Sequence, residues 1–567
     1  MGPYSLHPPH KEVPMLFRLK QITATLLMAS LLAVAAPSAL AFSDAEAHWA
    51  KEVIEKADQY GLMHGYSDGT FGVGRDMSRA EFVTVLCRMM GWEEADPAVV
   101  DIPDIQSHWA KGFITAAAEH GVADPAAHFR PGDPISREEM AVMLVKALDL
   151  DPLAQSLENS DPPFPDVTEH IGYITVARDI GMTNGTPGPE GTTVFLPHDS
   201  APREQAAAML VRVYERYTSR LDWLHAFYAF SSYSQIDCVE DLDALSVGWA
   251  RLCVDPENGP WINSTSAGGN DWVIPKDPTP ALERFAQAEL PYNLNVYADT
   301  NKTVTLADGT ATSVLELLLS SEETAYAAID ALVAVSGDYA GLTIDFEGLR
   351  TETYKDAFVR FLADLRAALP PDKPLWVCVP PDDWYKGYDY REIGEHCDKV
   401  ILMAHDYQWT SIPEYYLGTD RTHSPVTPID RVYTALQHIT DPDTGVQDKS
   451  KLALQISFGT AGFHVDENGL LVERTIYHPG PTTIAQRLNQ EDTVYTWDAE
   501  SRNAYIEYTT EDGEHYKLWF ENAQSVDAKL SLAKLFGVTG VSVWRLGTIP
   551  IYPDLEHYDV WTVFTGR

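Results

Sequence analysis

Short apolar runs separated by stretches of helical periodicity fill the second half of this chain, and their alternation restricts the folds open to it. The runs are rich in β-branched and aromatic residues, as strands are. They begin at Leu224, Leu242, Tyr292, Gly341, Leu375, Lys399, Leu452 and Gly540. Amphipathic stretches such as 353–369 and 527–537 lie between several of them. Strands that alternate with helices form parallel sheets, and eight such units predict a closed (β/α)8 barrel of the α/β class, with the active face at the carboxyl ends of the strands.

One gap in this series is too long for a single helix. It lies between the seventh and eighth runs, at about 461–522. Within it the segment NAYIEYTTEDGEHYKLWFE alternates polar and apolar residues on both sides of Asp512-Gly513, a dipeptide typical of tight hairpin turns. We therefore expect a small α+β insertion at this point of the barrel.

The fourth run, GLTIDFE, carries two acidic residues at its carboxyl end. Side chains alternate between the two faces of a strand, so Asp345 and Glu347 share a face with Thr343. In a barrel that face is the lumen. Two like charges in a partly dehydrated site do not both ionise easily, so one carboxyl keeps its proton near neutral pH. The pair is a candidate for acid catalysis, although rim or capping carboxylates would give the same pattern.

A repeat with a period near 60 residues precedes the barrel. Each unit has an aspartate before an amphipathic helix, then a glycine turn, a loop with an aromatic residue and a second helix. Ser78 with Glu81, and Ser136 with Glu139, have the spacing of a capping box at the start of that second helix. The repeats predict an all-α domain before the barrel. Its expected units, followed by the barrel, are 42–98, 99–158, 159–218 and 219–567.

Residues 1–41 have the pattern of a secretory signal peptide. Arg18 and Lys20 precede an apolar run that ends in Ala39-Leu40-Ala41, a small-x-small cleavage pattern. A membrane anchor is the alternative, but the apolar run is short for a span. No later run approaches that length, so we expect no membrane insertion after cleavage.

Charge and cysteine usage exclude some partners. The formal charge of −42 opposes nucleic acid or anionic membrane as a general partner, because both recruit basic surfaces. The five cysteines are too few and too scattered for a zinc site or a disulfide scaffold, and we expect them to be mostly core residues. The sequence indicates no metal and no other cofactor.

The repeats resemble a known family. MSRAE and ISREE, with a looser APREQ in the third unit, are similar to the Thr-Arg-Ala-Glu signature of S-layer homology repeats, which fix exported bacterial proteins to secondary polymers of the cell wall. The resemblance implies that Arg79, Arg137 and Arg203 bind the polymer, because an arginine at a helix N-terminus offers charge and hydrogen bonds to an anionic saccharide. Solvated first-turn arginines are the alternative. Trp49 and Trp109 are expected in the core.

The barrel resembles a second family. GLTIDFEG is similar to the fourth-strand signature of glycoside hydrolase family 18, Asp-Gly-x-Asp-x-Asp-x-Glu, with Gly341, Asp345 and Glu347 in matching positions. The other strands look like the branch of spore-cortex and cell-wall N-acetylglucosaminidases. The family folds as a TIM barrel and uses substrate-assisted retaining hydrolysis. The resemblance implies that Glu347 is the general acid and that Asp345 positions the acetamido group of the substrate.

The sequence departs from the family's motifs at three positions. Ala340 and Thr343 replace its first two aspartates, and His405 stands where the sixth-strand motif Met-x-Tyr-Asp has its tyrosine. Asp406 matches the aspartate of that motif, and Tyr407 replaces the tyrosine only if the register shifts. His405, Asp406 and Tyr407 are therefore candidate substrate contacts.

Two tryptophans complete the candidate site. Trp544 resembles the tryptophan on which the family stacks the cleaved sugar, since an aromatic face suits the apolar side of a pyranose. Trp384, on the loop after the fifth strand, would extend a glycan cleft, or else serve as a packing anchor.

Together the two resemblances predict a secreted, cell-wall-attached glycosidase that acts on N-acetylglucosamine-containing glycan. Peptidoglycan is favoured over chitin, because the repeats would hold the enzyme against the wall. Two alternatives are a chitinase-like enzyme and a catalytically inactive lectin with the same fold.

Overall fold

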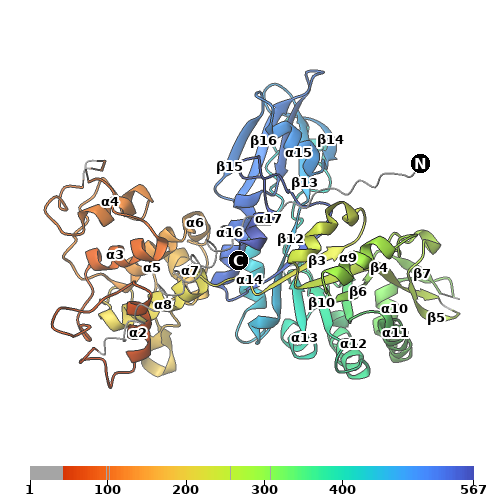
Figure 1. Cartoon of the computed structure of the whole chain (residues 1–567), viewed down its shortest axis with the longest axis horizontal. Helices are drawn as coiled ribbons and strands as arrows, with labels where there is room; N and C mark the ends of the chain where they lie inside the picture. Colours follow the sequence, from red (N-terminus) through yellow and green to blue (C-terminus); the bar gives the residue numbers. More distant parts are fainter. Residues whose placement is uncertain are drawn as a thin grey trace, which may run out of the picture. The chain divides into compact units, whose positions relative to one another are not determined.

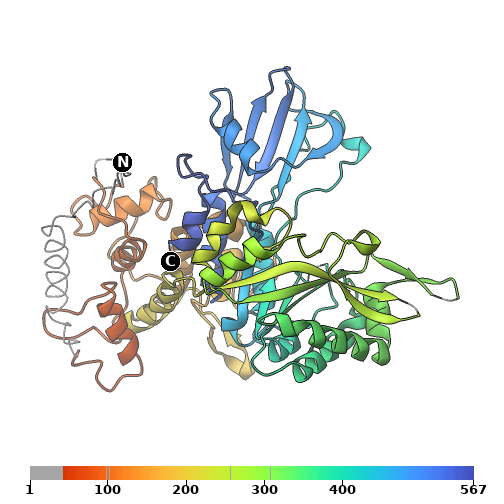
Figure 2. The same ribbon diagram turned by 45° about the vertical axis from the view of Figure 1, so that its right-hand side comes forward.

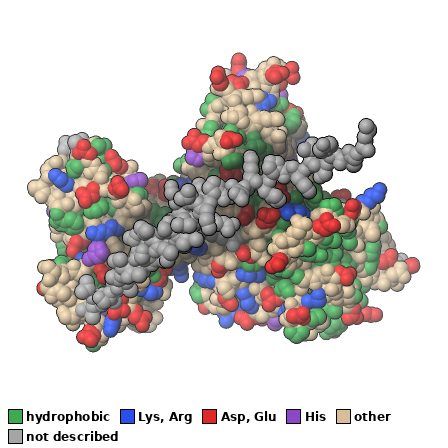
Figure 3. Space-filling view, viewed as in Figure 1, with side chains coloured by type: hydrophobic (Ala, Val, Ile, Leu, Met, Phe, Trp, Pro, Cys, Tyr) green, Lys and Arg blue, Asp and Glu red, His purple; other side chains and the backbone are tan. Residues whose placement is uncertain are grey.

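The computed structural model describes residues 42–566 except 98, 101, 256, 307 and 383, so the expected signal peptide lies outside the described residues. The chain forms two compact units (Figure 1). Among the described residues they are 42–137 with His198–Val211, and Glu138–Pro197 with 212–566. Acidic side chains are spread over the visible face of both units, as the net charge requires (Figure 3).

The repeats are helix-loop-helix units, as predicted. Their helices are α2 (Lys51–Gln59) and α3 (Arg79–Met90), α4 (Lys111–Glu119) and α5 (Arg137–Ala147), and α7 (Ile171–Asp179) and α8 (Arg203–Tyr217), with a short α6 (Asp151–Ser156) after α5 and a small β1 (Thr186–Pro187) and β2 (Thr193–Val194) pair before α8. The capping box of α3 is present: the Ser78 hydroxyl accepts from the Glu81 N–H, and the Glu81 carboxylate accepts from the Ser78 N–H.

The recurring aspartate of each repeat accepts hydrogen bonds from the loop that leads to the second helix. Asp44 accepts hydrogen bonds from the backbone N–H groups of Phe71, Gly72 and Val73 at 2.8–2.9 Å. Asp104 and Asp166 make the corresponding bonds 25–30 residues further along the chain. The repeat pattern is thus held by carboxylates that satisfy loop donors.

The expected core position of two tryptophans is wrong. Trp49 is 66% exposed and Trp109 is 61% exposed. Each lies just before the first helix of its repeat, beside a histidine ring at 5.4 Å. Helical alanines and isoleucines fill the core instead, including Ile54 and Ile114.

Eight parallel strands close into a barrel, and all eight predicted runs are confirmed as strands. Neighbouring strands pair in a ring in which the last strand pairs with the first. In ring order from the first strand they are β3 (Trp223–Tyr228), β4 (Ala244–Asp255), β6 (Tyr292–Asp299), β9 (Leu342–Glu347), β10 (Leu375–Val379), β11 (Lys399–Leu402), β12 (Leu452–Ser457) and β18 (Gly540–Trp544).

The helices lie outside the strands (Figure 2). They are α9 (Thr279–Gln287), α10 (Val314–Ser320), α11 (Glu322–Val335), α12 (Lys355–Ala368), α13 (Tyr390–His396), α14 (Ile429–Ile439), α16 (Ala523–Leu535) and α17 (Trp561–Thr565). Alternation on β9 explains the packing: Phe346 points outward and meets Phe361 of α12 at 5.6 Å, while its neighbours Asp345 and Glu347 point inward.

Strand β4 is longer than a barrel strand needs. It continues as a hairpin with β5 (Gly259–Asn263), and a second small hairpin, β7 (Thr303–Thr305) with β8 (Ala311–Ser313), follows β6. Between Val247 and Ala250 the pairing of β4 with β6 shifts by one residue, which is a β-bulge. A bulge reverses which residues of the strand face the lumen beyond it.

The predicted insertion is confirmed as a five-stranded antiparallel sheet with one helix, the blue sheet at the top of Figure 1. Its strands are β13 (Thr460–Val465), β14 (Leu471–Tyr477), β15 (Val494–Asp498), β16 (Asn503–Thr509) and β17 (His515–Phe520), and its helix is α15 (Pro481–Leu488). The predicted hairpin around Asp512-Gly513 joins β16 to β17. Trp519 and Phe520 point to opposite faces of the sheet and enter separate apolar clusters.

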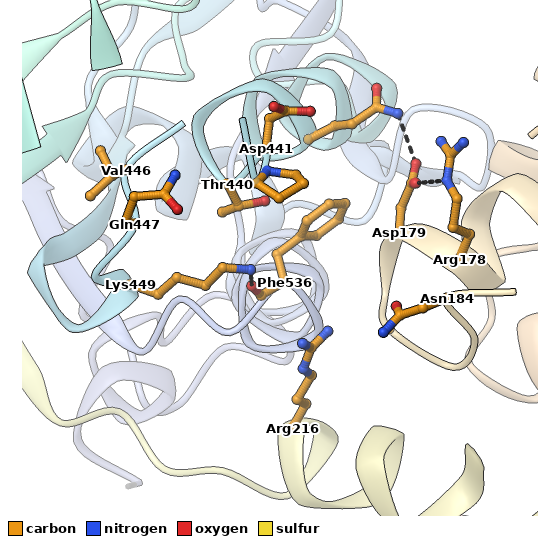
Figure 4. Close-up of a pocket in the computed structure, with 13 residues that line it drawn as sticks. Arg178, Asp179, Asn184, Arg216, Thr440, Asp441, Val446, Gln447, Lys449 and Phe536 are labelled. Carbon is orange, nitrogen blue, oxygen red and sulfur yellow. Dashed lines mark hydrogen bonds and ion pairs between the residues drawn. The ribbon is translucent and has the colours of Figure 1, made fainter. Parts of the chain in front are cut away.

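Within the second unit, helices α7, α14 and α16 all end beside a cavity of about 720 Å³ (Figure 4). Helix C-termini carry partial negative charge, and cations balance it there. Arg216 donates to the carbonyl oxygens of Ile180 and Leu535, and Lys449 donates to that of Phe536. These cations are helix caps that join the third repeat to the barrel helices.

Among the described residues no helix is both long enough and apolar enough to cross a membrane. All five cysteines are free thiols, four of them buried.

Candidate active site

A cavity of about 250 Å³ inside the barrel brings together five of the residues predicted from sequence. They are Asp345, Glu347, His405, Asp406 and Trp544. The wall also contains residues that the sequence did not single out: Phe227, Arg251, Trp272, Tyr297, Cys378, Met403 and Gln455.

Asp345 is the more deeply buried member of the acidic pair, with 4% of its surface exposed. Its Oδ2 accepts from Asn295 Nδ2 at 3.3 Å, while its Oδ1 is buried and has no hydrogen-bond partner among the described residues. Burial raises the pKa of Asp345 to about 6, against the lowering effects of hydrogen bonds from Asn295 and Cys378 and of the charge of His405. The unpartnered Oδ1 is therefore an acceptor placed for a donor on a ligand.

Glu347 ends the strand and is partly open to the cavity. Burial, and next the negative charge of Asp345, raise the pKa of Glu347 to about 8. Glu347 is then protonated at neutral pH, while Asp345 is mostly ionised. This division of protons gives the cavity one acid and one anion.

His405 does not sit as a free hydrogen-bond donor in the cavity. Its Nδ1 lies 2.9 Å from Asp406 Oδ2 and its Nε2 lies 2.6 Å from Gln455 Oε1. Two acceptors favour a ring that carries both protons. Burial is the largest single influence and lowers the pKa of His405, but the charge of Asp406 and the hydrogen bonds to Asp406 and Gln455 together outweigh it, so the net shift is upward. His405 is thus a fixed positive charge near the acids, with both N–H groups already engaged.

Two of the three departures, Thr343 and His405, are the ends of one buried hydrogen-bond chain. From His405, Gln455 leads to Ser542 at 3.3 Å, and Ser542 lies 2.9 Å from His225. The other nitrogen of His225 lies 2.9 Å from Ser246, which lies 2.7 Å from Thr343. Burial lowers the pKa of His225 to about 3, so it is neutral. Neutral groups fill the place where the signature has a carboxylate.

Aromatic rings form one wall of the cavity. Trp272 stacks on Tyr297 with ring centres 4.6 Å apart, and it lies 5.8 Å from Trp544. The position of Tyr297 on the lumen face could have been predicted from the sequence, because alternation along β6 places it on the same face as Asn295 and Asp299. The position of Trp272 in the cavity could not have been predicted, because Trp272 lies in an irregular segment without a motif.

Two predicted contacts lie outside this cavity. Trp384 is 46% exposed and meets Tyr407 edge to face at 5.5 Å. Neither residue lines the cavity that holds the carboxylates.

The three repeat arginines stand at the first residues of α3, α5 and α8, and all are at least 92% buried. They are therefore not solvated first-turn residues. Arg203 donates to Glu81 at 2.9 Å and to the Phe71 and His64 carbonyls at 3.0 Å. It lines a cavity of about 190 Å³ in the first unit, together with the exposed Trp109. Arg79 donates to the Phe129 carbonyl at 2.7 Å.

Comparisons with known proteins match both parts of the chain. Residues 298–548 match the profile of the glycosyl hydrolases family 18, and residues 41–83 and 101–141 match the S-layer homology domain. The cortical fragment-lytic enzyme of Bacillus anthracis is 25% identical over 216 residues, 36% of this chain and 45% of that enzyme. Cell surface glycoprotein 1 of Acetivibrio thermocellus is 37% identical over 148 residues, 24% of this chain and 6% of that protein.

Solved structures are similar at low identity. The spore cortex-lytic enzyme SleL of Bacillus cereus is 17% identical, with a TM-score of 0.45 over 61% of this chain and 74% of that chain. This chain spans about half the length of the cortical fragment-lytic enzymes that it matches. Among the described residues, no group of three or more histidine, cysteine or acidic side chains is placed to hold a metal ion.

Proposed function

We propose that this chain, which joins S-layer homology domains to a domain of glycosyl hydrolase family 18, is an exported, wall-attached glycosidase that hydrolyses N-acetylglucosamine-containing glycan, with peptidoglycan as its substrate. One observation carries the proposal: Glu347, with its pKa raised to about 8, stands beside Asp345 in an aromatic-walled cavity. A neutral carboxylic acid at this position is a proton donor at physiological pH.

The proposed mechanism uses the substrate's own acetamido group. Glu347 protonates the glycosidic oxygen, and the acetamido carbonyl oxygen attacks the anomeric carbon, which gives an oxazolinium ion and releases the leaving sugar. Glu347, now a carboxylate, takes a proton from the water that opens this ion, so the configuration is retained. Asp345 Oδ1, which has no hydrogen-bond partner in the described part of the chain, accepts from the acetamido N–H and stabilises the developing positive charge. Trp544 supports the apolar face of the sugar.

The repeats support wall attachment and therefore the choice of peptidoglycan over chitin. A wall-bound enzyme meets peptidoglycan continuously. The signal-like pattern of residues 1–41 supports export. The names of the Bacillus relatives point to the same class of substrate.

The hydrolase proposal is tested with purified protein on peptidoglycan and on chitin oligosaccharides. We expect reducing ends from peptidoglycan, and at least 10³-fold slower release by Glu347→Gln, because the amide cannot donate a proton to the leaving oxygen. Equal release by both proteins would remove the acid assignment. Binding without release would identify a lectin.

Wall attachment is tested by sedimentation with purified cell walls. Trp109→Ala should reduce retention, because Trp109 is an exposed ring on the cavity that Arg203 lines. Trp49→Ala is the matched control, because Trp49 has the same position in the first repeat and does not line that cavity. Unchanged retention of Trp109→Ala would argue against this cavity as the polymer site.

A further inference from the structure

Arg251 is a cation with unused hydrogen-bonding capacity in a cavity otherwise rich in carboxylates. Its side chain is 16% exposed and lines the cavity with Asp345 and Glu347. It has a single hydrogen bond among the described residues, from Nη1 to Asp299 Oδ2, and at 3.4 Å that bond is long. Its Nε is buried and has no partner among the described residues. A guanidinium has five N–H donors, so four are unused among the described residues.

Asp299 depends only partly on Arg251, because one of its two carboxylate oxygens has other donors. The Oδ1 of Asp299 accepts from the backbone N–H groups of Asn301 and Lys302 at 2.7 and 2.8 Å, which already satisfies it at the start of a turn. By contrast, the buried Arg203 uses three nitrogens in bonds of 2.9–3.0 Å. A buried arginine held only for structure is normally satisfied in this way. Arg251 is held in place mainly by the Tyr297 ring, 4.8 Å from its guanidinium carbon.

The β-bulge in β4 aims Arg251 into the barrel. Ser246 faces the lumen, where it contacts Thr343. Strict alternation from Ser246 would turn Arg251 outward. The one-residue shift between Val247 and Ala250 reverses this, and Arg251 pairs with Tyr297. Bulges next to active sites commonly redirect one side chain in this way.

The register also sets the distance from the catalytic pair. Arg251 pairs with Tyr297 on β6, and Tyr297 pairs with Asp345 on β9. Two strand spacings separate the α-carbons of Arg251 and Asp345, which is about 9.6 Å. This is about the length of a sugar ring with a substituent, so Arg251 reaches a group on the sugar bound beside the acids.

We propose that Arg251 binds a carboxylate carried by the substrate, namely the 3-O-lactyl group of a muramic acid residue that has no stem peptide. The planar fork of a guanidinium matches a carboxylate with two parallel hydrogen bonds. Chitin has no such group, so Arg251 would form no ion pair with it. The inference rests on the proposed function and deepens it, because it makes Arg251 a specificity residue for the muramic-acid-containing glycan of peptidoglycan.

Binding can be measured without turnover in the Glu347→Gln background, using the full mature chain. The probes are glycan strands of alternating N-acetylglucosamine and N-acetylmuramic acid, freed of stem peptides by an amidase, and the same strands with their lactyl carboxylates converted to methylamides. We expect calorimetry to give a Kd for the charged strands that is roughly 10- to 100-fold lower than for the neutral strands. Adding Arg251→Gln should bring this ratio to one or below, because the remaining cation, His405, has both ring nitrogens engaged by Asp406 and Gln455, and no guanidinium is left to bind the lactyl carboxylate.

Arg350→Gln is the matched control. Arg350 also lies 4.8 Å from a tyrosine ring and also makes one 3.4 Å hydrogen bond, but it is exposed and outside the cavity. The Arg350→Gln variant should leave the ratio of the Kd values for charged and neutral strands unchanged. Equal Kd values for charged and neutral strands, no binding of either strand, or an equal loss for both in Arg251→Gln would overturn the proposal.

Hydrolysis by the parent protein separates the two claims. If the parent binds charged strands preferentially but releases no product, the carboxylate site stands and the hydrolase proposal fails. If the parent cleaves both kinds of strand with the same kcat/KM and binds them equally, the hydrolase proposal stands and the role of Arg251 fails.

Discussion

Replacing Asp345 by asparagine should lower the pKa of Glu347, and the size of the change follows from the strand geometry. Residues two apart on a strand are about 6.6 Å apart. At an effective dielectric constant of about 20, two unit charges at that distance repel by about 2.5 kcal/mol, which corresponds to a pKa change of about 2. Asp345 is ionised when Glu347 titrates, because their pKa values are about 6 and about 8. Removing the neighbouring charge makes ionisation of Glu347 easier.

The pKa of Glu347 should therefore fall from about 8 to about 6 in Asp345→Asn. It should stay above the ordinary value for glutamate, because burial is the larger cause of the shift and persists in the variant. Trp544 and Trp272 line the same cavity, so tryptophan fluorescence against pH reports the titration without any substrate.

Two variants assign the fluorescence transition. Glu347→Gln should abolish it, because no titrating carboxyl remains at that position. Asp338→Asn, four residues before the start of β9, should leave its midpoint unchanged. A midpoint in Asp345→Asn that stays near 8 or moves upward would refute the charge coupling on which the acid assignment depends.

Further predictions follow from the same structure. The kcat/KM of the parent should be bell-shaped, falling below pH about 6 and above pH about 8, because the anion of the pair must be ionised and Glu347 must be protonated. His405→Gln should move the alkaline limb to higher pH, opposite to Asp345→Asn, because the charge of His405 lowers the pKa of Glu347. Lys529→Met should lower the free energy of unfolding, measured in guanidinium chloride, by about 3–5 kcal/mol, because it leaves Glu521 as an unpaired charge; the two side chains are fully buried at 2.8 Å.

The local sequence pattern was sufficient to predict the strands of the barrel. Each strand is a run of mostly apolar residues, rich in β-branched and aromatic types, so its place in the chain can be predicted from that run alone. The hairpin at Asp512-Gly513 was found in the same way, because a two-residue turn needs residues that tolerate positive φ, and Gly513 has φ 85°. Asp345 and Glu347 could be placed on one face because the period of a strand is fixed by its geometry.

The same local rules failed where a long-range contact decides the outcome. Trp49 and Trp109 lie just before α2 and α4, where a large ring could turn into the core, yet both are exposed, because smaller residues of those helices fill the interior. His405 matches a motif position, but its ring nitrogens are taken by Asp406 and by Gln455, which is 50 residues away in sequence. A motif gives the position of a side chain and not its partners.

The sequence by itself determined the order of strands and helices, the repeats, and the shared face of the acidic pair, because these depend on residues close together in the chain. The tertiary structure alone decided which other side chains join that pair. Arg251 is the clearest case: alternation along β4 points it outward, and only the bulge formed against β6 turns it into the lumen. A bulge depends on pairing between two strands, so a pattern read along one strand cannot contain it.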